Sequence, residues 1–352
     1  LMYEEIAEKK FKELQNKDDY LILAIESSCD ETSAAVTRGR DVLSLVIASQ
    51  IEIHKRFGGV VPEIASRNHV SAIRNTAFQA LKQANVSLSD ISAVAVTYGA
   101  GLLGALLVGV SYAKALAYAM NVPLIKVNHV RGHISANYIA DKSLEPPYLC
   151  LLASGGHTAI VEVTGYDDVK VIGTTQDDAV GEAFDKVARV LGLPYPGGPE
   201  IEKLAKNGKP TIDFPKGFHN KNTLDFSYSG LKTSVINYMH TAAQKGEEVN
   251  KADVACSFQK SAVGVMTENV EKALLKTGLK TVVIAGGVAS NKHLREEMEK
   301  VGKKHGVNVI YPPLKLCTDN AAMIGACAYN LIKEGKGRAS LDLDASASVS
   351  LE

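Results

Sequence analysis

Paired cysteines are missing from this sequence, which excludes two common kinds of small scaffold. The five cysteines lie far apart and none belongs to a C-x-x-C pair; they are Cys29, Cys150, Cys256, Cys317 and Cys327. We therefore expect neither a disulfide framework nor a thiolate zinc site. Unpaired thiols suit a reducing compartment, so we expect a cytoplasmic protein.

An excess of charge of one sign is also missing. Lys and Arg together number 39, as do Asp and Glu. The net charge neither indicates nor excludes a nucleic-acid partner, because a local basic patch can be cancelled elsewhere. The first twenty residues are highly charged and lack the apolar core of a signal peptide. We expect residues 1–20 to form a short helical extension outside the main fold.

A hydrophobic run long enough to cross a membrane is missing as well. Residues 100–120 are almost wholly apolar, but Lys114 and recurring glycines interrupt them. The continuous part is shorter than the ~20 residues that a span needs, so we interpret it as a buried helix and expect no membrane association. Small residues recur every four positions along it, which suits packing on the protein's own sheet or docking of a partner helix equally well. This strip consists of Ala105, Gly109, Ala113 and Ala117.

Two segments, 21–49 and 148–175, look like copies of one unit. In each, an apolar run ends in a loop of small residues and then resumes as a hairpin. Helices and further strands follow both copies, so a βββαβα unit occurs twice. We expect the α/β fold of actin, hexokinase and Hsp70, a duplicated ribonuclease H-like fold with two lobes and a cleft between them. The lobes would span 21–145 and 146–338, with a last helix that could return to the first lobe and a tail at 339–352.

The segment NHVRGH holds His129 and His133 four positions apart. On a helix these positions lie one above the other, so both imidazoles could reach one metal ion. Two histidines with ordinary structural roles are the alternative, unless a third ligand joins them. Asp319 is the best candidate, although the helix dipole would also explain an aspartate in a first turn capped by Thr318. Val130 stands where a zinc peptidase carries the general base of H-E-x-x-H, which excludes that class.

Several loops suit a nucleotide. Ser154-Gly155-Gly156 follows an apolar strand and offers backbone N–H groups to an anion, or is only a tight turn. Asp185 could accept hydrogen bonds from ribose hydroxyls, or pair with a neighbouring cation on a solvated helix face. Asn291 ends a second strand–glycine–helix passage, AGGVASN, which suits an adenine and is weak evidence alone.

Seven motifs occur in the order found in one family: ESSCDETSAA, NHVRGHISA, LASGGHT, GEAFDKVARVLGLPYPGGP, FSYSGLKTSV, AGGVASN and CTDNAAMIG. Over about residues 21–335 the chain resembles the bacterial tRNA N6-adenosine threonylcarbamoyltransferases, once misnamed glycoprotein endopeptidases. The resemblance implies transfer of a threonylcarbamoyl group from threonylcarbamoyl adenylate, an activated donor that releases AMP. The acceptor would be the N6 amine of adenosine 37 in tRNAs that read codons starting with A.

The resemblance also implies roles for particular residues. His129, His133 and Asp319 match the family's ligands for one divalent ion, iron or zinc. Asp30 matches an acidic position linked to catalysis, and Glu202 matches an acidic contact that some members use. Positions that match contacts to the nucleotide substrate are Leu152, Ala153, Ser154, Gly155, Gly156, Asp185, Gly198 and Asn291.

One position departs from the family pattern. Many members have glutamate where this chain has Arg131, between the two histidines. The ligands themselves are retained, so metal binding is not affected by this change. The arginine could touch RNA phosphate or be solvated, and we expect it to be solvated.

The partners implied by the resemblance are tRNA, a homologous actin-like subunit and a small ATPase subunit. Two other functions remain open. A small-molecule kinase of the same superfold would consume ATP without tRNA. A non-catalytic assembly subunit is the third possibility, against which the intact metal and loop motifs speak.

Overall fold

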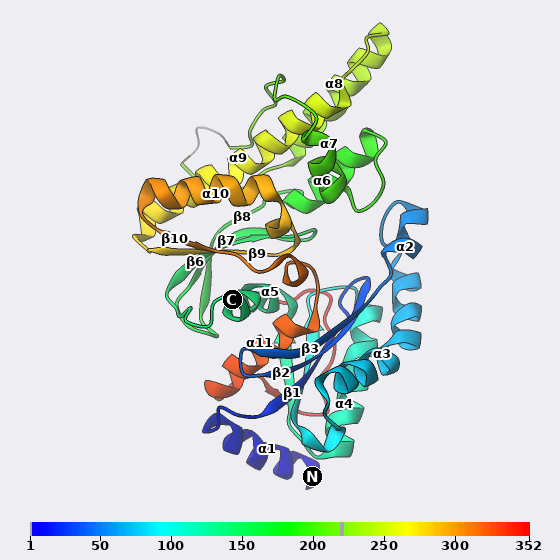
Figure 1. Cartoon of the computed structure of the whole chain (residues 1–352), viewed down its shortest axis with the longest axis vertical. Helices are drawn as coiled ribbons and strands as arrows, with labels where there is room; N and C mark the ends of the chain where they lie inside the picture. The colour runs from blue at the N-terminus through cyan, green and yellow to red at the C-terminus, as the bar shows by residue number, and fades with distance from the viewer. Residues whose placement is uncertain (1, 219–221) are drawn as a thin grey trace. The chain divides into compact units, whose positions relative to one another are not determined.

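The computed structural model describes residues 2–218 and 222–352, which form two compact units (Figure 1). The first unit contains the residues up to Leu144, Gly165–Val169 and Thr318–Glu352. The second contains Glu145–Thr164 and Lys170–Cys317. The last helix of the chain therefore belongs to the first unit, far in sequence from the strands on which it packs.

Each unit is built on a sheet, and the two sheets share one strand order. The first sheet runs β3-β2-β1-β4-β5, with β11 beyond β5, and the second runs β8-β7-β6-β9-β10. The first strand of each pairs antiparallel with the second and parallel with the fourth. The prediction of a unit that occurs twice is confirmed. The strands are β1 (Leu21–Glu26), β2 (Glu31–Arg38), β3 (Asp41–Ser49), β4 (Ile91–Gly99), β5 (Leu124–Asn128), β6 (Tyr148–Ala153), β7 (Thr158–Val163), β8 (Val169–Thr174), β9 (Thr281–Ala285), β10 (Asn308–Ile310) and β11 (Arg338–Ala339).

Strand alternation decides which side chains of the first sheet face which helices. Leu23 and Ile25 of β1 join the core formed with α3 and α4. On β2, Ser33 accepts a hydrogen bond from the backbone N–H of Ala321 in α11, 2.9 Å away, so α11 covers the opposite face. The first unit's helices are α1 (Met2–Gln15), α2 (Ile51–His54), α3 (Pro62–Ala84), α4 (Leu103–Met120), α5 (His129–Ala140) and α11 (Ala321–Lys333).

The second unit buries its sheet under a helical layer in which α9 packs against α7, α8 and α10. Its core joins residues of β6 and β9 with large side chains from the helices, including Phe184 and Phe258. The two rings meet edge to face with centroids 5.0 Å apart, a favourable aromatic geometry. The helices are α6 (Val180–Val190), α7 (Gly197–Ala205), α8 (Ser229–Lys245), α9 (Lys251–Thr277) and α10 (Lys292–His305).

The N-terminal segment is helical, as expected, but the expectation that it lies outside the main fold is wrong. One face of α1 is buried through Tyr3, Ala7, Phe11 and Leu14. The Tyr3 hydroxyl donates a hydrogen bond to the carbonyl of Val122, 3.0 Å away. This buried face is hard to recognise in the sequence, because the segment is highly charged and two of the four buried residues are an alanine and a tyrosine.

Helix α4 carries the apolar run, and among the described residues it alone is long and apolar enough to cross a membrane by length and composition. Its strip of small residues is buried. A Cβ added to Gly109 would lie 2.3 Å from Oγ of Ser27, so glycine permits the helix to approach the loop after β1 closely. The strip therefore packs inside the first unit, and its interpretation as a docking surface is wrong.

The tail at 339–352 packs beside the C-terminal ends of β4 and β5. The backbone N–H of Ser346 donates to the carbonyl of Tyr98 at 2.8 Å, and the side-chain amide of Asn128 donates to the carbonyl of Ser350 at 2.9 Å. The tail thus lies beside the start of α5.

Candidate metal centre and nucleotide loops

Helix α5 carries both predicted histidine ligands, and the chain enters it directly from β5. Asn128 is the N-cap: its side-chain oxygen accepts hydrogen bonds from the N–H groups of Val130 (2.8 Å) and Arg131 (3.4 Å). This cap fixes the first turn and leaves His129 and His133 one turn apart on the same face. Their rings meet edge to face with centroids 4.7 Å apart.

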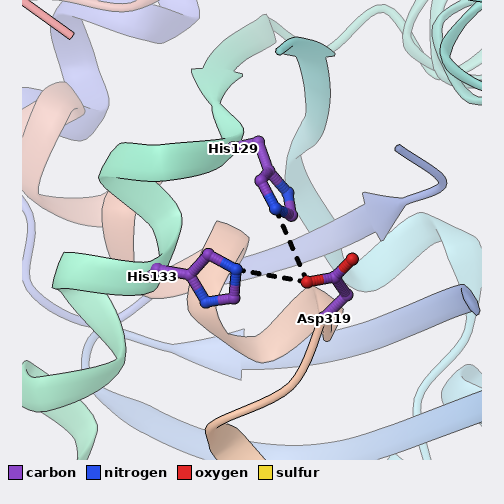
Figure 2. Close-up of side chains that lie close together, drawn as sticks. All are labelled: His129, His133 and Asp319. Atoms are coloured by element: carbon purple, nitrogen blue, oxygen red, sulfur yellow. Dashed lines mark ion pairs between the residues drawn. The ribbon is translucent and has the colours of Figure 1, made fainter. Parts of the chain in front are cut away.

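Asp319 joins the two histidines, as the sequence predicted (Figure 2). Its Oδ1 lies 3.5 Å from Nε2 of His129 and 3.1 Å from Nε2 of His133. The expectation that Thr318 caps the following helix is wrong. Asn320 is the N-cap and accepts from the N–H of Met323 at 3.0 Å, so Asp319 lies in the loop before the helix. From this loop the carboxylate of Asp319 reaches the histidines of α5.

The three side chains fit a metal ion. Metal–ligand distances of about 2.1 Å in a tetrahedral site place neighbouring ligand atoms about 3.4 Å apart. The Nε2–Oδ1 distances of 3.1 and 3.5 Å lie on either side of that value, and the three ligand atoms are all within 4.8 Å of one another. The side chains of His129 and His133 are 12% and 3% exposed, so the site is shielded but not closed.

The charges at this site favour a cation. Burial opposes the charged imidazole, but the carboxylates of Asp319 and Glu26 outweigh it and raise the pKa of His129 to about 9. In the metal-free chain the proton on His129 therefore supplies positive charge that a bound ion would replace. Two imidazoles and one carboxylate suit iron or zinc equally.

Sequence reasoning missed Glu26. This carboxylate ends β1, is fully buried, and its Oε2 lies 3.1 Å from Nδ1 of His129. The available signal was a charged residue that ends an otherwise apolar strand, LILAIE. Such a residue is rarely buried without a partner.

Asp30 lies in the loop after β1 and is 8% exposed. Burial raises the pKa of this carboxyl group, and the negative charge of Asp319 raises it further. The catalytic role of Asp30 stays a prediction.

The expectation that Arg131 is solvated is wrong. Its side chain is 15% exposed and pairs with Asp167 through Nη1 at 2.5 Å. Nη2 and Nε also donate to the carbonyl of Leu351, at 2.7 and 3.1 Å. Asp167 also pairs with Lys336 at 3.0 Å. The guanidinium therefore contacts two groups that are remote in the sequence: Asp167 in the segment Gly165–Val169, and the carbonyl of Leu351 in the tail.

In the second unit, the loop after β6 lies against two other glycine positions. A Cβ at Gly181 would lie 2.6 Å from the carbonyl oxygen of Ser154, and one at Gly286 would lie 2.4 Å from that of Ala153. Gly286 also has a φ of +90°, which side-chain-bearing residues rarely adopt. These contacts bring the β6 loop, the start of α6 and the loop after β9 together.

The same loops leave space on their other side. Among the described residues, a Cβ added at Gly155, Gly156, Gly198 or Gly287 would have no heavy atom within 4 Å apart from those of the glycine, its chain neighbours and its own helix. Open space above glycine backbone lets a phosphate or a base approach N–H groups closely. The geometry is therefore suitable for a nucleotide, while the contacts of Leu152, Ala153 and Ser154 with one stay predictions.

The other predicted substrate contacts also lie in the second unit, where their side chains have internal partners. Asp185 accepts from the N–H of Gly197 at 2.7 Å, and Glu202 accepts from the N–H of Lys292 at 3.3 Å. Asn291 caps α10 and donates its side-chain amide to Gln259 at 2.9 Å. These contacts position α7 and α10. Binding of substrate by these residues stays a prediction.

Comparisons with known proteins agree with these observations. A family model described as tRNA N6-adenosine threonylcarbamoyltransferase matches residues 41–326. A protein of that name from Clostridium novyi (strain NT) is 59% identical over 331 residues, which cover 93% of this chain and 96% of the relative. One from Clostridium perfringens (strain 13) is 57% identical over 320 residues, 90% of this chain and 94% of the relative.

Solved structures show the fold. Full-length HypF in a phosphate- and nucleotide-bound form matches with a TM-score of 0.61 at 16% identity, over 92% of this chain and 47% of HypF. Component A of (R)-2-hydroxyglutaryl-CoA dehydratase from Acidaminococcus fermentans matches with a TM-score of 0.54 at 13% identity, over 89% of this chain and 99% of that protein. The chain has the predicted actin/hexokinase-like α/β fold.

Proposed function

Because the chain belongs to the tRNA N6-adenosine threonylcarbamoyltransferase family, we propose that it transfers a threonylcarbamoyl group to the N6 amine of adenosine 37 in tRNA. It is an acyltransferase, and its tRNA substrates would be those that read codons starting with A. One observation in this structure carries the proposal: the side chains of His129, His133 and Asp319 lie close enough together to hold one metal ion.

The donor in this proposal is threonylcarbamoyl adenylate. The adenine amine is a poor nucleophile, because its lone pair is delocalised into the ring, so the acyl group requires activation. N6 attacks the carbamoyl carbon, the bond from that carbon to the phosphate oxygen breaks, and AMP leaves while N6 loses a proton. The glycine loops of the second unit would hold the adenylate through backbone N–H groups.

The ligands of the proposed metal centre would act on the threonylcarbamoyl part of the donor. His129, His133 and Asp319 would hold an iron or zinc ion, which supplies a Lewis acid that orients the donor and stabilises developing negative charge. Asp30 would act in catalysis, and its raised pKa suits a group that accepts the proton from N6.

A reconstitution experiment tests the proposal. The chain is mixed with threonylcarbamoyl adenylate, tRNA and candidate partner proteins, with and without a chelator, and modified adenosine and AMP are measured. We expect one AMP for each modified adenosine, and loss of both with chelator. Equal transfer in chelator would remove the metal from the mechanism. Consumption of ATP without tRNA would support a kinase, and no turnover with any partner would support an assembly subunit.

A partner subunit would dock on the first unit. The packed helices α3 and α4 expose large apolar side chains that the sheet does not cover: Val70, Phe78, Leu103, Leu107 and Tyr118. We propose that a homologous actin-like subunit covers them, and that a small ATPase completes the assembly. Phe78→Glu should abolish co-purification with that subunit, while circular dichroism should show an unchanged fold.

The compartment in this proposal is the cytoplasm. All five cysteines are free, which suits a reducing environment.

A further inference from the structure

Glu26 is a fully buried carboxylate with three hydrogen-bonding neighbours. Its Oε1 accepts from the backbone N–H of Ser28 at 2.6 Å, and its Oε2 accepts from the hydroxyl of Thr97 at 2.5 Å. Oε2 also lies 3.1 Å from Nδ1 of His129. Thr97 is on β4, the parallel neighbour of β1, so the carboxylate is held by two adjacent strands of the sheet.

The imidazole is the cationic partner of this carboxylate. Within the described part of the chain, no lysine or arginine forms an ion pair with Glu26, whereas His129 does. Moving an unpaired carboxylate out of water is costly. The charge of Glu26 is therefore compensated from the side of His129, either by a proton on the ring or by an ion bound to it.

The contact also determines which nitrogen of His129 faces the metal centre. Glu26 accepts a hydrogen bond from Nδ1, which places a proton on that nitrogen. Nε2 is then the nitrogen that faces Oδ1 of Asp319, 3.5 Å away, and it is the one that would give its lone pair to a metal ion. His133 differs, because its buried Nδ1 has no hydrogen-bond partner among the described residues. The carboxylate thus acts on one of the two imidazoles.

We propose that Glu26 is a positioning residue of the metal centre, which holds His129 as the Nδ1–H tautomer and makes its Nε2 a better ligand. The inference rests on the proposed metal site and concerns a residue outside the three ligands. A carboxylate on the remote nitrogen of a ligating histidine typically improves metal affinity 10–100-fold. Ser28 Oγ also lies 3.1 Å from Nδ1, but a neutral hydroxyl cannot replace the charge.

The first experiment measures zinc and cobalt affinity of Glu26→Gln by competition with a chromophoric chelator. The amide retains the size of the side chain and an oxygen for Ser28, while it removes the negative charge. We expect the Kd to rise about 10–100-fold and the visible cobalt bands to shift. Glu5→Gln, an exposed change of the same type on α1, should leave both unchanged.

A double-mutant cycle with His129→Ala separates positioning from general stabilisation. If Glu26 acts through His129, Glu26→Gln should weaken metal binding in the parent chain and have little further effect in the His129→Ala chain. An equal loss in both backgrounds would mean that Glu26 only stabilises the fold, and would overturn the proposal. The same Kd and spectrum for Glu26→Gln and the parent would also overturn it.

A measurement on the unaltered chain does not depend on whether the variants fold. Nitrogen-15 NMR of histidine side chains in the zinc-loaded protein should show His129 with a proton on Nδ1 and zinc on Nε2. Zinc on Nδ1 would overturn the inference while it supports the metal site. A chain that binds no zinc, cobalt or iron would contradict the metal site itself, and the inference with it.

Discussion

Nε2 of His133 lies 3.1 Å from Oδ1 of Asp319, although one residue belongs to α5 and the other to the loop before α11. The return of Thr318–Glu352 to the first unit produces this contact. The metal centre is therefore complete within one unit.

Removal of either ligand should abolish tight metal binding. His133→Ala and Asp319→Ala each leave two ligands, and we expect a loss of about 100-fold or more in zinc affinity. His240→Ala, an exposed histidine on α8, is the matched control and should bind normally. Affinity is measured by chelator competition and folding by circular dichroism. Unchanged binding by His133→Ala would contradict the assignment.

Two glycines should separate binding from folding in the second unit. Gly155 faces open space, so Gly155→Val should change stability little and weaken AMP binding by about tenfold, the equivalent of one hydrogen bond to a charged group. Gly286→Val meets a positive φ and the carbonyl of Ala153, and should lower the free energy of unfolding by roughly 2 kcal/mol or more. Calorimetric titration with AMP and thermal melting measure the two effects. A destabilised Gly155→Val would argue against an open loop.

The stability of the metal-free chain should fall as pH rises from about 4.5 to about 7 because of Glu31. Burial is the main cause that raises the pKa of Glu31 from 4.5 to about 7, and its Oε2 has no hydrogen-bond partner among the described residues. Between these values the folded state binds the extra proton, so unfolding becomes easier as pH increases. The shift corresponds to about 3 kcal/mol at most. In Glu31→Gln this component should disappear, so the stability difference between variant and parent should grow from pH 5 to pH 8 in denaturant titrations.

The ion pair of Arg131 and Asp167 should be detectable by charge exchange. Arg131→Glu places two carboxylates together at a mostly buried position, and we expect a loss of about 1–3 kcal/mol. Adding Asp167→Arg should recover much of it in the double variant, although Asp167 also pairs with Lys336. Urea unfolding of the four chains gives the coupling energy. A coupling energy near zero would show that the pair does not stabilise the fold.

Helix α1 should contribute to the stability of the first unit. Phe11 is 4% exposed, so Phe11→Ala should cost about 3–5 kcal/mol through lost burial and a cavity. Lys9→Ala on the exposed side of the same helix should cost less than about 0.5 kcal/mol. Thermal melting distinguishes the two. Equal melting temperatures would return α1 to the role of an extension outside the core.

The sequence alone determined the features that depend on local spacing. Alternating apolar strands predicted the duplicated sheets, and the four-residue interval between His129 and His133 predicted two imidazoles on one helix face. The order of the motifs was sufficient to identify the family. Such features are readable because helix and strand periodicity are properties of neighbouring residues.

Only the tertiary structure decided which distant groups meet. It showed that Asp319 turns toward α5, that Glu26 lies behind His129, that Arg131 pairs with Asp167, and that the Gly109 strip faces inward. These contacts join segments far apart in the chain, and their energies come from burial and charge pairing that no local pattern records. The prediction that α1 is an exposed extension failed for the same reason. Its sequence shows an apolar face but not the surface of the first unit on which that face packs.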